Sequence, residues 1–166
     1  MMNIAFEPLC MDHQSAVMSI FNHYVETTTA AFPGKPLPEP LFAVFLKRAE
    51  GGYPAYALVD GDSGAVVGFC QLSAYNPFSS FAKTAEVTYF IAADYVGRGL
   101  GSKCLEKLTE EGKKMGVAHL VAEVSSENAE SLRFHERHGF RRAGELAGVG
   151  EKLGRTFGVV YLQKDI

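Results

Sequence analysis

Hydrophobic and polar positions alternate along the chain with two periods, one typical of strands and one typical of helices. Alternation at every second residue predicts a strand, whereas apolar residues three and four positions apart predict an amphipathic helix. The helical period is found in residues 12–25, 39–50, 101–114 and 128–138. The strand pattern is found in residues 3–9, 56–60, 65–75, 84–92, 119–124, 140–146 and 156–163. The predicted order of elements is therefore βααβββαβαββ.

Turn-forming residues separate these elements. Asp12 precedes the first helical pattern and is expected to be its N-cap. Four prolines between residues 33 and 40 mark a loop, and Gly51-Gly52 ends the second helix. The segment Gly61-Asp-Ser-Gly64 joins two strand patterns as a hairpin would. The centre of the sheet is therefore expected to be antiparallel.

Composition limits the classes of protein and of partner. A length of 166 residues with 47% hydrophobic residues suits one domain with a substantial core. The formal charge of -3 and the lack of a basic cluster argue against nucleic acid and anionic membranes as partners. Cys10, Cys70 and Cys104 lie in apolar patterns and are expected to be free thiols in the cytoplasm. No apolar run approaches the length of a membrane span, so neither export nor membrane insertion is expected.

A glycine-rich segment joins the strand predicted at residues 84–92 to the helix predicted at residues 101–114. It reads Val96-Gly97-Arg98-Gly99-Leu100-Gly101-Ser102. Glycine lets the backbone approach a ligand closely, and a helix start has unpaired N–H groups whose dipole favours an anion. The spacing excludes a Walker A loop and departs from the Gly-x-Gly-x-x-Gly dinucleotide fingerprint. The segment therefore predicts a cradle for the phosphates of another cofactor.

Two motifs carry a resemblance to a known family. The segment from Ile91 to Gly101 resembles acyl-CoA-binding motif A of the GNAT N-acetyltransferases, although Val96 stands where that motif usually has Gln or Arg. Residues 123–140 resemble motif B, which consists of a strand, an Asn, a short helix and then Gly-Phe. Together with residues 21–32, the motifs make nearly the whole chain resemble the phosphinothricin and methionine sulfoximine acetyltransferase branch.

The resemblance implies a fold, a domain and a cofactor. The implied GNAT fold is α/β (α+β), with a mixed, mostly antiparallel and splayed sheet flanked by helices on both faces. Residues 1–166 would form a single acyl-CoA N-acyltransferase domain, which uses acetyl-CoA as co-substrate and forms a homodimer. The residues that the resemblance places at the cofactor are Ile91, Val96, Gly97, Arg98, Gly99, Gly101, Ser102, Asn128 and Ser131.

Acetyl transfer to an amine needs a base for the amine and a proton for the leaving thiolate. Glu86 is the expected base, because it lies in a strand with few charges and resembles the catalytic Glu of the phosphinothricin branch. His135 stands where most of the superfamily has a Tyr that gives a proton to the thiolate, and the phosphinothricin branch also has His there. Without the motif, Glu86 would be read as a carboxylate facing water, His135 as a helix-surface residue and Asn128 as a simple N-cap.

Neither a metal site nor a cysteine nucleophile is expected. His135, Glu136 and His138 have no third ligand at a suitable spacing. No cysteine stands beside a His in a nucleophile motif, so direct attack in a ternary complex is the simpler mechanism. The acceptor pocket should combine aromatic walls with charges that could hold a zwitterion. The candidates for this pocket are Tyr24, Glu26, Phe32, Phe78, Phe81 and Lys152.

The chain departs from the branch in two segments that face the acceptor. An Arg before the central strand and a Trp-x-Asp near the C-terminus are replaced by residues 79–83 and by Thr156-Phe157-Gly158. The expected function is acetyl transfer from acetyl-CoA to the primary amine of a small molecule, such as phosphinothricin or methionine sulfoximine. The alternatives are a protein N-terminus or a polyamine as acceptor, or a non-catalytic acyl-CoA-binding sensor. An acidic acceptor cleft would favour the polyamine, and a long open groove would favour a peptide.

Overall fold

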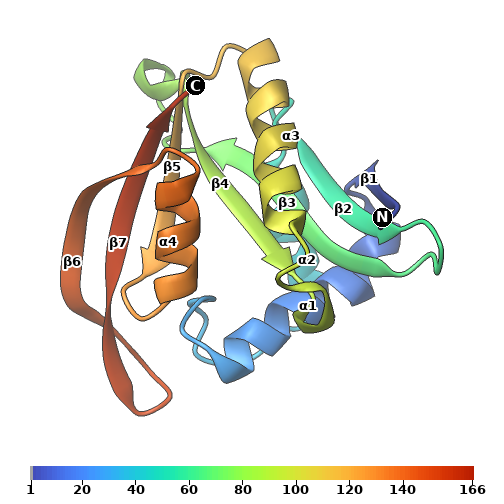
Figure 1. Ribbon diagram of the computed structural model, residues 1–166, viewed down its shortest axis with the longest axis horizontal. Helices are drawn as coiled ribbons and strands as arrows, with labels where there is room; N and C mark the ends of the chain where they lie inside the picture. Colours follow the sequence, from blue (N-terminus) through green and yellow to red (C-terminus); the bar gives the residue numbers. More distant parts are fainter. Residues whose placement is uncertain (1) are drawn as a thin grey trace.

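The computed structural model describes residues 2–166, whose strands form one mixed sheet (Figure 1). In sheet order the strands are β1 (Ile4–Pro8), β2 (Ala55–Asp60), β3 (Val66–Ala74), β4 (Thr84–Ile91), β5 (His119–Ser125), β7 (Arg155–Asp165) and β6 (Arg141–Lys152). β4 and β5 run parallel, and the other neighbouring strands are antiparallel. The predicted mostly antiparallel sheet is confirmed, including the hairpin between β2 and β3.

β4 and β5 separate soon after they begin. Their paired residues run only from Thr84 to Glu86 on β4 and from His119 to Val121 on β5. β4 nevertheless continues to Ile91, and β5 continues beyond its paired residues as well. The facing edges of the two strands therefore stop bonding to one another in the middle of the sheet. This is the splay that the resemblance implied.

Two pairs of helices cover the two faces of the sheet (Figure 1). They are α1 (Gln14–Thr27) and α2 (Phe42–Arg48) on one face, and α3 (Leu100–Lys114) and α4 (Ala129–Arg137) on the other. Alternation along β3 explains the two hydrophobic cores, because successive side chains point to opposite faces. Phe69 belongs to the core under α1 and α2, whereas Cys70 and Leu72 belong to the core under α3.

The ends of some elements differ from the sequence predictions. Asp12 is not the N-cap of α1, because a 3₁₀ turn (Met11–His13) comes first and Nδ1 of His13 accepts a hydrogen bond from the Cys10 N–H at 3.1 Å. β6 is longer than the predicted strand at residues 140–146. It is an edge strand whose residues 141–149 are all exposed, so no alternation of burial marks its length.

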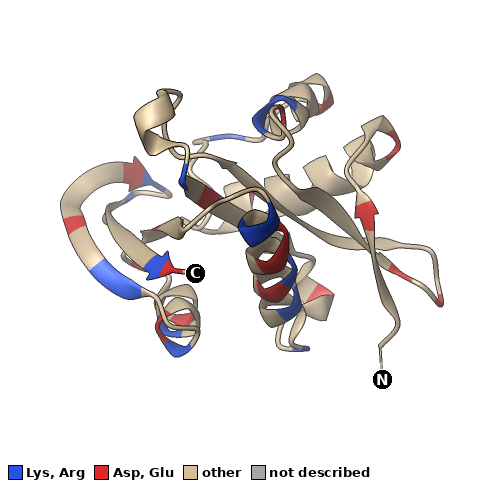
Figure 2. Ribbon diagram, turned by 90° about the horizontal axis from the view of Figure 1, so that it is seen from above, with Lys and Arg blue, Asp and Glu red and all other residues tan. Residues whose placement is uncertain are grey.

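The surface carries charges of both signs, and the three cysteines are free thiols. Positively and negatively charged residues are interspersed along α3 (Figure 2), where Lys107 and Glu111 form an ion pair of 2.8 Å. Cys70 and Cys104 are buried free thiols, and Cys10 is an exposed one. Among residues 2–166, no helix has the length and apolar character needed to cross a membrane.

Candidate active site

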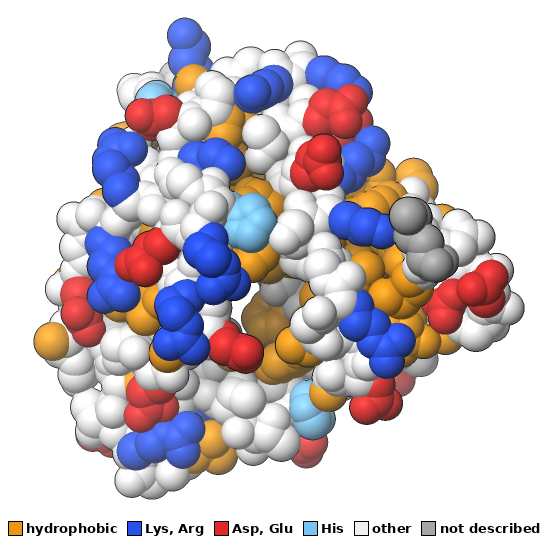
Figure 3. All heavy atoms as spheres, in the orientation of Figure 1, with side chains coloured by type: hydrophobic (Ala, Val, Ile, Leu, Met, Phe, Trp, Pro, Cys, Tyr) orange, Lys and Arg blue, Asp and Glu red, His pale blue; other side chains and the backbone are white. Residues whose placement is uncertain are grey.

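A cavity of about 1040 Å³ opens where β4 and β5 separate. Figure 3 shows the molecule hollowed at its centre, with hydrophobic side chains deep in the hollow and charged side chains around it. One half of the cavity, the cradle half, lies at the start of α3 and along α4. The other half, the α2 half, lies under α1 and α2, and Glu86 and Phe90 of β4 line it. Because one cavity joins both halves, ligands bound in each would meet at β4.

Gly97 and Gly99 shape the cradle half. Both have a φ of +80°, a left-handed conformation that favours glycine. A Cβ at either position would meet nothing within 4 Å, so the space in front of both is open. Within residues 2–166, the N–H groups of Gly97, Arg98 and Gly99 form no backbone hydrogen bond. Together with the first turn of α3, they present donors and a positive dipole end that fit a phosphate or pyrophosphate.

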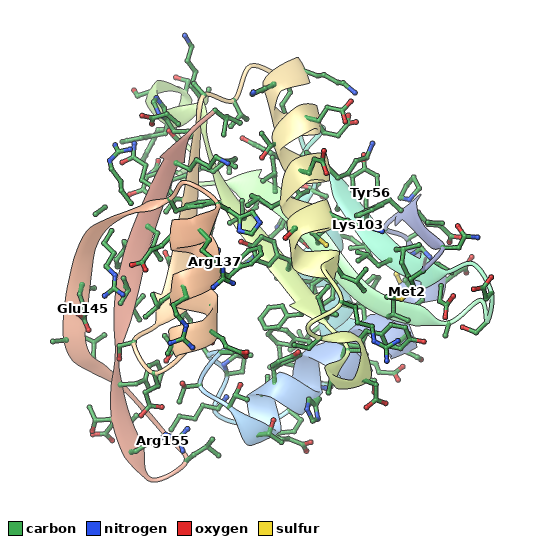
Figure 4. The ribbon with its side chains drawn as sticks, in the orientation of Figure 1. Met2, Tyr56, Lys103, Arg137, Glu145 and Arg155 are labelled. Atoms are coloured by element: carbon green, nitrogen blue, oxygen red, sulfur yellow. The ribbon has the colours of Figure 1, made fainter. Side chains whose placement is uncertain are left out.

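Side chains from α3 and α4 meet beside the cradle. The hydroxyl of Ser102 lies 2.9 Å from Nε2 of His138, whose Nδ1–H donates to the Phe134 carbonyl at 2.7 Å. A Cβ on Gly101 would lie 3.4 Å from the Phe134 ring, so there is little room for a side chain between the helices. Arg137, near the end of α4, lines the same cavity (Figure 4). Ser102 therefore links the two helices as well as facing the cradle.

Asn128 begins α4 and faces the cavity. Its Oδ1 accepts a hydrogen bond of 3.2 Å from the N–H of Ser131, so it is the N-cap of the helix. Both residues line the cavity. Within residues 2–166, Nδ2 of Asn128 has no hydrogen-bond partner. The side-chain amide is thus able to donate to a ligand while its oxygen caps α4.

His135 is buried behind Tyr89. Its Nδ1 lies 2.7 Å from the carbonyl oxygen of Ser131, so Nδ1 must carry the proton and donate it. Burial lowers the pKa of His135, which favours the neutral imidazole. Nε2 is then an acceptor, and the hydroxyl of Tyr89 is its donor. Both Tyr89 and His135 line the cavity, but neither ring nitrogen of His135 is without a partner.

Glu86 is a half-buried carboxyl group in the α2 half. Burial raises its pKa, the nearby carboxylate of Glu123 raises it further, and the guanidinium of Arg48 lowers it. Glu86 lies opposite Val121 in the parallel ladder, so Glu123, two residues further along β5, faces the same side of the sheet. The raised pKa makes the carboxylate of Glu86 a stronger base than that of an exposed glutamate.

Tyr24 fixes the end of β4 from the α1 side. Its hydroxyl donates a hydrogen bond of 2.5 Å to the carbonyl of Ile91, and its ring packs against Phe90 with centroids 5.3 Å apart. Tyr24 and Ile91 both line the cavity. The contact therefore holds the backbone of β4 in place where the sheet opens.

Most of the predicted site residues meet at this one cavity. Those that line it are Glu86, His135, Ile91, Val96, Gly97, Gly99, Gly101, Ser102, Asn128, Ser131, Tyr24 and Phe32. Phe32 is also stacked on Phe157, with ring centroids 6.0 Å apart. The sequence motifs thus identified segments that the fold brings together from four different elements and three loops.

Five predicted residues do not line the cavity, and one of them is Phe81, which is 41% exposed between β3 and β4. Arg98 is exposed, and its guanidinium lies 4.9 Å from the centre of a neighbouring tyrosine ring. Glu26 is exposed on α1, and Phe78 is 72% exposed on the loop between β3 and β4. Lys152 is buried, and its Nζ donates to the carbonyl of Ala31 at 2.6 Å. Lys152 is therefore tied to the backbone next to the cavity wall.

Three residues that the sequence reasoning missed also line the cavity: Tyr89, Glu123 and Arg48. Tyr89 alternates with Ala85 and Val87 on an otherwise apolar face of β4, and a buried tyrosine hydroxyl needs a partner. That pattern was a usable signal. Glu123 and Arg48 gave none, because their place beside Glu86 depends on the parallel register of β5 and on how α2 lies over the sheet.

Comparison with known proteins decides the family. The model of the acetyltransferase (GNAT) family matches residues 17–140. The chain belongs to the GNAT acetyltransferase family. It is 32% identical over 151 residues to the L-methionine sulfoximine/L-methionine sulfone acetyltransferase of Pseudomonas aeruginosa, covering 90% of this chain and 87% of that protein. It is also 32% identical to the phosphinothricin N-acetyltransferase of Alcaligenes faecalis, covering 93% of this chain and 79% of that protein.

A solved acetyltransferase structure agrees in fold along nearly the whole chain. The acetyltransferase from Salmonella typhimurium, solved with its cofactor acetyl-CoA, superposes with a TM-score of 0.89 at 27% identity. The match covers 98% of this chain and 94% of that protein. This GNAT protein is an acetyltransferase, and the family and this complex support acetyl-CoA as its co-substrate. The open, donor-lined cradle fits the phosphate groups of such a molecule.

Proposed function

We propose that this GNAT enzyme transfers an acetyl group from acetyl-CoA to the primary amine of a small amino-acid analogue, such as methionine sulfoximine or phosphinothricin. The observation that carries the proposal is the position of Glu86. Its carboxyl group, with a raised pKa, faces the same cavity as the glycine cradle. A base at this place can act on an amine that enters from the α2 half. The similarity to two amino-acid-analogue acetyltransferases supports the choice of acceptor.

The proposed co-substrate site uses mainly backbone groups. The N–H groups of Gly97, Arg98, Gly99, Gly101 and Ser102 would bind the pyrophosphate. The N–H of Val96 already donates to the carbonyl of Ala93 at 3.3 Å, so Val96 would only line this site. Asn128 and Ser131 would face the pantetheine arm, and the backbone of Ile91 would lie beside the acetyl group. Bound there, acetyl-CoA supplies the thioester carbonyl carbon that the amine attacks. The wide split between β4 and β5 leaves room for an extended arm between the strands.

The protein's own groups would move two protons. Glu86 accepts a proton from the amine at its carboxylate, directly or through water, and so provides the neutral amine that attacks. His135 and Tyr89 form the opposite wall, where a proton is needed for the departing thiolate. The Nδ1 hydrogen of His135 is held by Ser131 and the hydroxyl hydrogen of Tyr89 by Nε2 of His135, so the Tyr89 hydroxyl would turn away from Nε2 to give its proton to the thiolate. We assign the acid role to this pair.

Direct transfer in a ternary complex fits the cavity better than a covalent enzyme intermediate. None of the three cysteines lines the cavity within the part of the chain described, and two of them are fully buried. The α2 half contains Arg48 as well as Glu86 and Glu123, so its charge is mixed. A mixed charge suits a zwitterion better than a polyamine, for which a uniformly acidic pocket would be expected.

The experiment is a two-substrate initial-rate study with acetyl-CoA and methionine sulfoximine, with the N-acetylated product identified by mass spectrometry. Direct transfer predicts N-acetyl methionine sulfoximine and intersecting double-reciprocal lines. Parallel lines would point to a ping-pong mechanism and contradict direct transfer. Absence of any acetylated product would contradict the choice of acceptor.

Three further expectations from the sequence accompany this proposal. We infer that residues 1–166 act as one acyl-CoA N-acyltransferase domain, since a single sheet connects all seven strands. We infer a homodimer, for which the exposed rings of Phe78 and Phe81 are available contact surface. We infer a cytoplasmic location, which is consistent with the free thiols.

A further inference from the structure

Three charged side chains converge on the α2 half without neutralising one another. Arg48, Glu86 and Glu123 all line this half of the cavity. Among residues 2–166, none of the three forms a salt bridge. The charges of Arg48 and Glu123 nevertheless reach Glu86 strongly enough to alter its pKa. Arg48 and Glu86 thus face the same half of the cavity, with a gap wider than a salt bridge between them.

The position of Arg48 is fixed by the packing of α2. Phe45 packs edge-on against Phe69 of β3, with ring centroids 5.4 Å apart, and against Phe21 of α1 at 5.2 Å. Arg48 follows Phe45 by three residues, which is about one helical turn, so both lie on neighbouring parts of the helix surface. Phe42, another turn before, is fully buried. The aromatic core therefore holds the last turn of α2, and Arg48 with it, over the cavity.

We propose that Arg48 binds the α-carboxylate of the acceptor and thereby selects amino acids over simple amines. This inference rests on the proposed function and names the anchor for its substrate. In an α-amino acid one carbon separates the amine from the carboxylate, so a ligand of this kind can place both groups between Glu86 and Arg48. A guanidinium binds a carboxylate with two parallel hydrogen bonds, which also orients the amine.

The walls of the α2 half indicate the rest of the acceptor. Leu41 and Val44 line the cavity and are 41% and 49% exposed, which leaves apolar surface for a ligand to cover. The side chain of the acceptor would lie against these two residues. The sequence predicted that Glu26 and Lys152 would supply the charges of the acceptor pocket, but neither lines the cavity. Arg48 does line it and supplies a positive charge. The cation therefore comes from α2, a helix that carries none of the family motifs.

The test compares two amines that differ only in the carboxylate. Methionine sulfone contains the carboxylate, and 3-(methylsulfonyl)propylamine has the same side chain without it. Rates are measured for the wild type, Arg48→Gln, Arg48→Lys and the matched control Lys47→Gln, which changes the neighbouring exposed cation on α2. An alkaline buffer keeps Glu86 deprotonated in every variant, so the effect of Arg48 on its pKa does not enter. Calorimetric titration with acetyl-CoA checks that each variant is folded.

The proposal predicts a selective loss. Arg48→Gln should lower kcat/KM for methionine sulfone by about tenfold or more, mainly through KM, which corresponds to about 1.4 kcal/mol. The simple amine should react as it does with the wild type, Arg48→Lys should recover part of the loss, and Lys47→Gln should change neither rate. An equal effect of Arg48→Gln on both amines, or no effect, would overturn the proposed role of Arg48 and leave the proposed function standing. Failure of the wild type to acetylate methionine sulfone would instead contradict the proposed function.

Discussion

Tyr89 donates its hydroxyl hydrogen to Nε2 of His135, and the two rings stack with centroids 5.6 Å apart and planes inclined by 20°. The contact joins β4 to α4 across the cradle half of the cavity. It fixes the tautomer of the imidazole, because the Nδ1–H already donates to Ser131. A histidine held in this way depends on its tyrosine partner for any proton that Nε2 exchanges. The chemistry expected of His135 should therefore require Tyr89.

Replacing Tyr89 with Phe keeps the stacked ring and removes the hydroxyl. We expect kcat to fall by about a hundredfold, because a positioned acid typically contributes that much or more. The KM for acetyl-CoA should stay unchanged, since the cradle is intact. The ¹⁵N shifts of His135 should also change, because Nε2 loses its donor. Tyr56→Phe, which removes a hydroxyl outside the cavity, is the control, and an unchanged kcat in Tyr89→Phe would exclude an acid role for this hydroxyl.

Glu86→Gln retains the size of the side chain and removes the base. Turnover near neutral pH should fall by about a hundredfold or more, whereas the affinity for acetyl-CoA should not change. The activity of the variant should recover in alkaline buffer, where the acceptor amine loses its proton to solvent. Glu145→Gln, on the exposed edge strand β6 (Figure 4), is the matched control. Wild-type turnover in Glu86→Gln would assign the base to another group.

Glu123 should set the pH range in which Glu86 works. The charges that act on Glu86 come from Glu123 on β5, which raises its pKa, and from Arg48 on α2, which lowers it. Tyr161 on β7 also lies within electrostatic reach of Glu86. Activity that needs the deprotonated carboxylate is lost as the pH falls through this raised pKa. Glu123→Gln removes a like charge, so the acidic limb of the kcat/KM profile should move to lower pH. A limb that stays in place, or moves to higher pH, would mean that Glu123 does not act on the base.

The cradle can be tested at Gly99, whose φ is +80°. Gly99→Ala places a methyl group in the open space of the cradle and disturbs a left-handed residue at a cost of about 1–2 kcal/mol. We expect the affinity for acetyl-CoA to fall by about tenfold, or 1.4 kcal/mol. Gly116→Ala is the matched control, because Gly116 has a φ of +88°, an equally open Cβ position and a place at the far end of α3. Equal affinities in the two variants would remove the cradle from the co-substrate site.

The local parts of the fold were predictable because they depend on short patterns. The period of apolar residues located every helix and strand, and the three alternating glycines marked the turn from β4 into α3. The length of β6 was not predictable, since an exposed edge strand does not need an apolar face. The start of α1 was not predictable either. The side chain of His13, and not that of Asp12, accepts the hydrogen bond from the N–H of Cys10.

Some residues of the site were predictable from short sequence motifs, and others depend on tertiary packing. Glu86 and His135 lie in segments with a recognisable order of residues, and the cavity contains both. Arg48 lies in a segment with an ordinary amphipathic pattern, and only the packing of Phe45 against β3 brings it over Glu86. Lys152 appeared suitable for binding a zwitterion, but its Nζ is bound to the backbone of Ala31. Only the tertiary contacts therefore show which charged side chains can bind the acceptor.

The acceptor proposed for this enzyme is an amino-acid analogue. The most direct measurement is kcat/KM with acetyl-CoA for five acceptors, with the rate monitored as release of the CoA thiol. The acceptors are methionine sulfoximine, methionine sulfone, phosphinothricin, spermidine and a short peptide. A pocket with Arg48 facing Glu86 and Glu123 predicts the highest kcat/KM for one of the three amino-acid analogues. The highest kcat/KM for spermidine or the peptide would contradict the assignment of the acceptor.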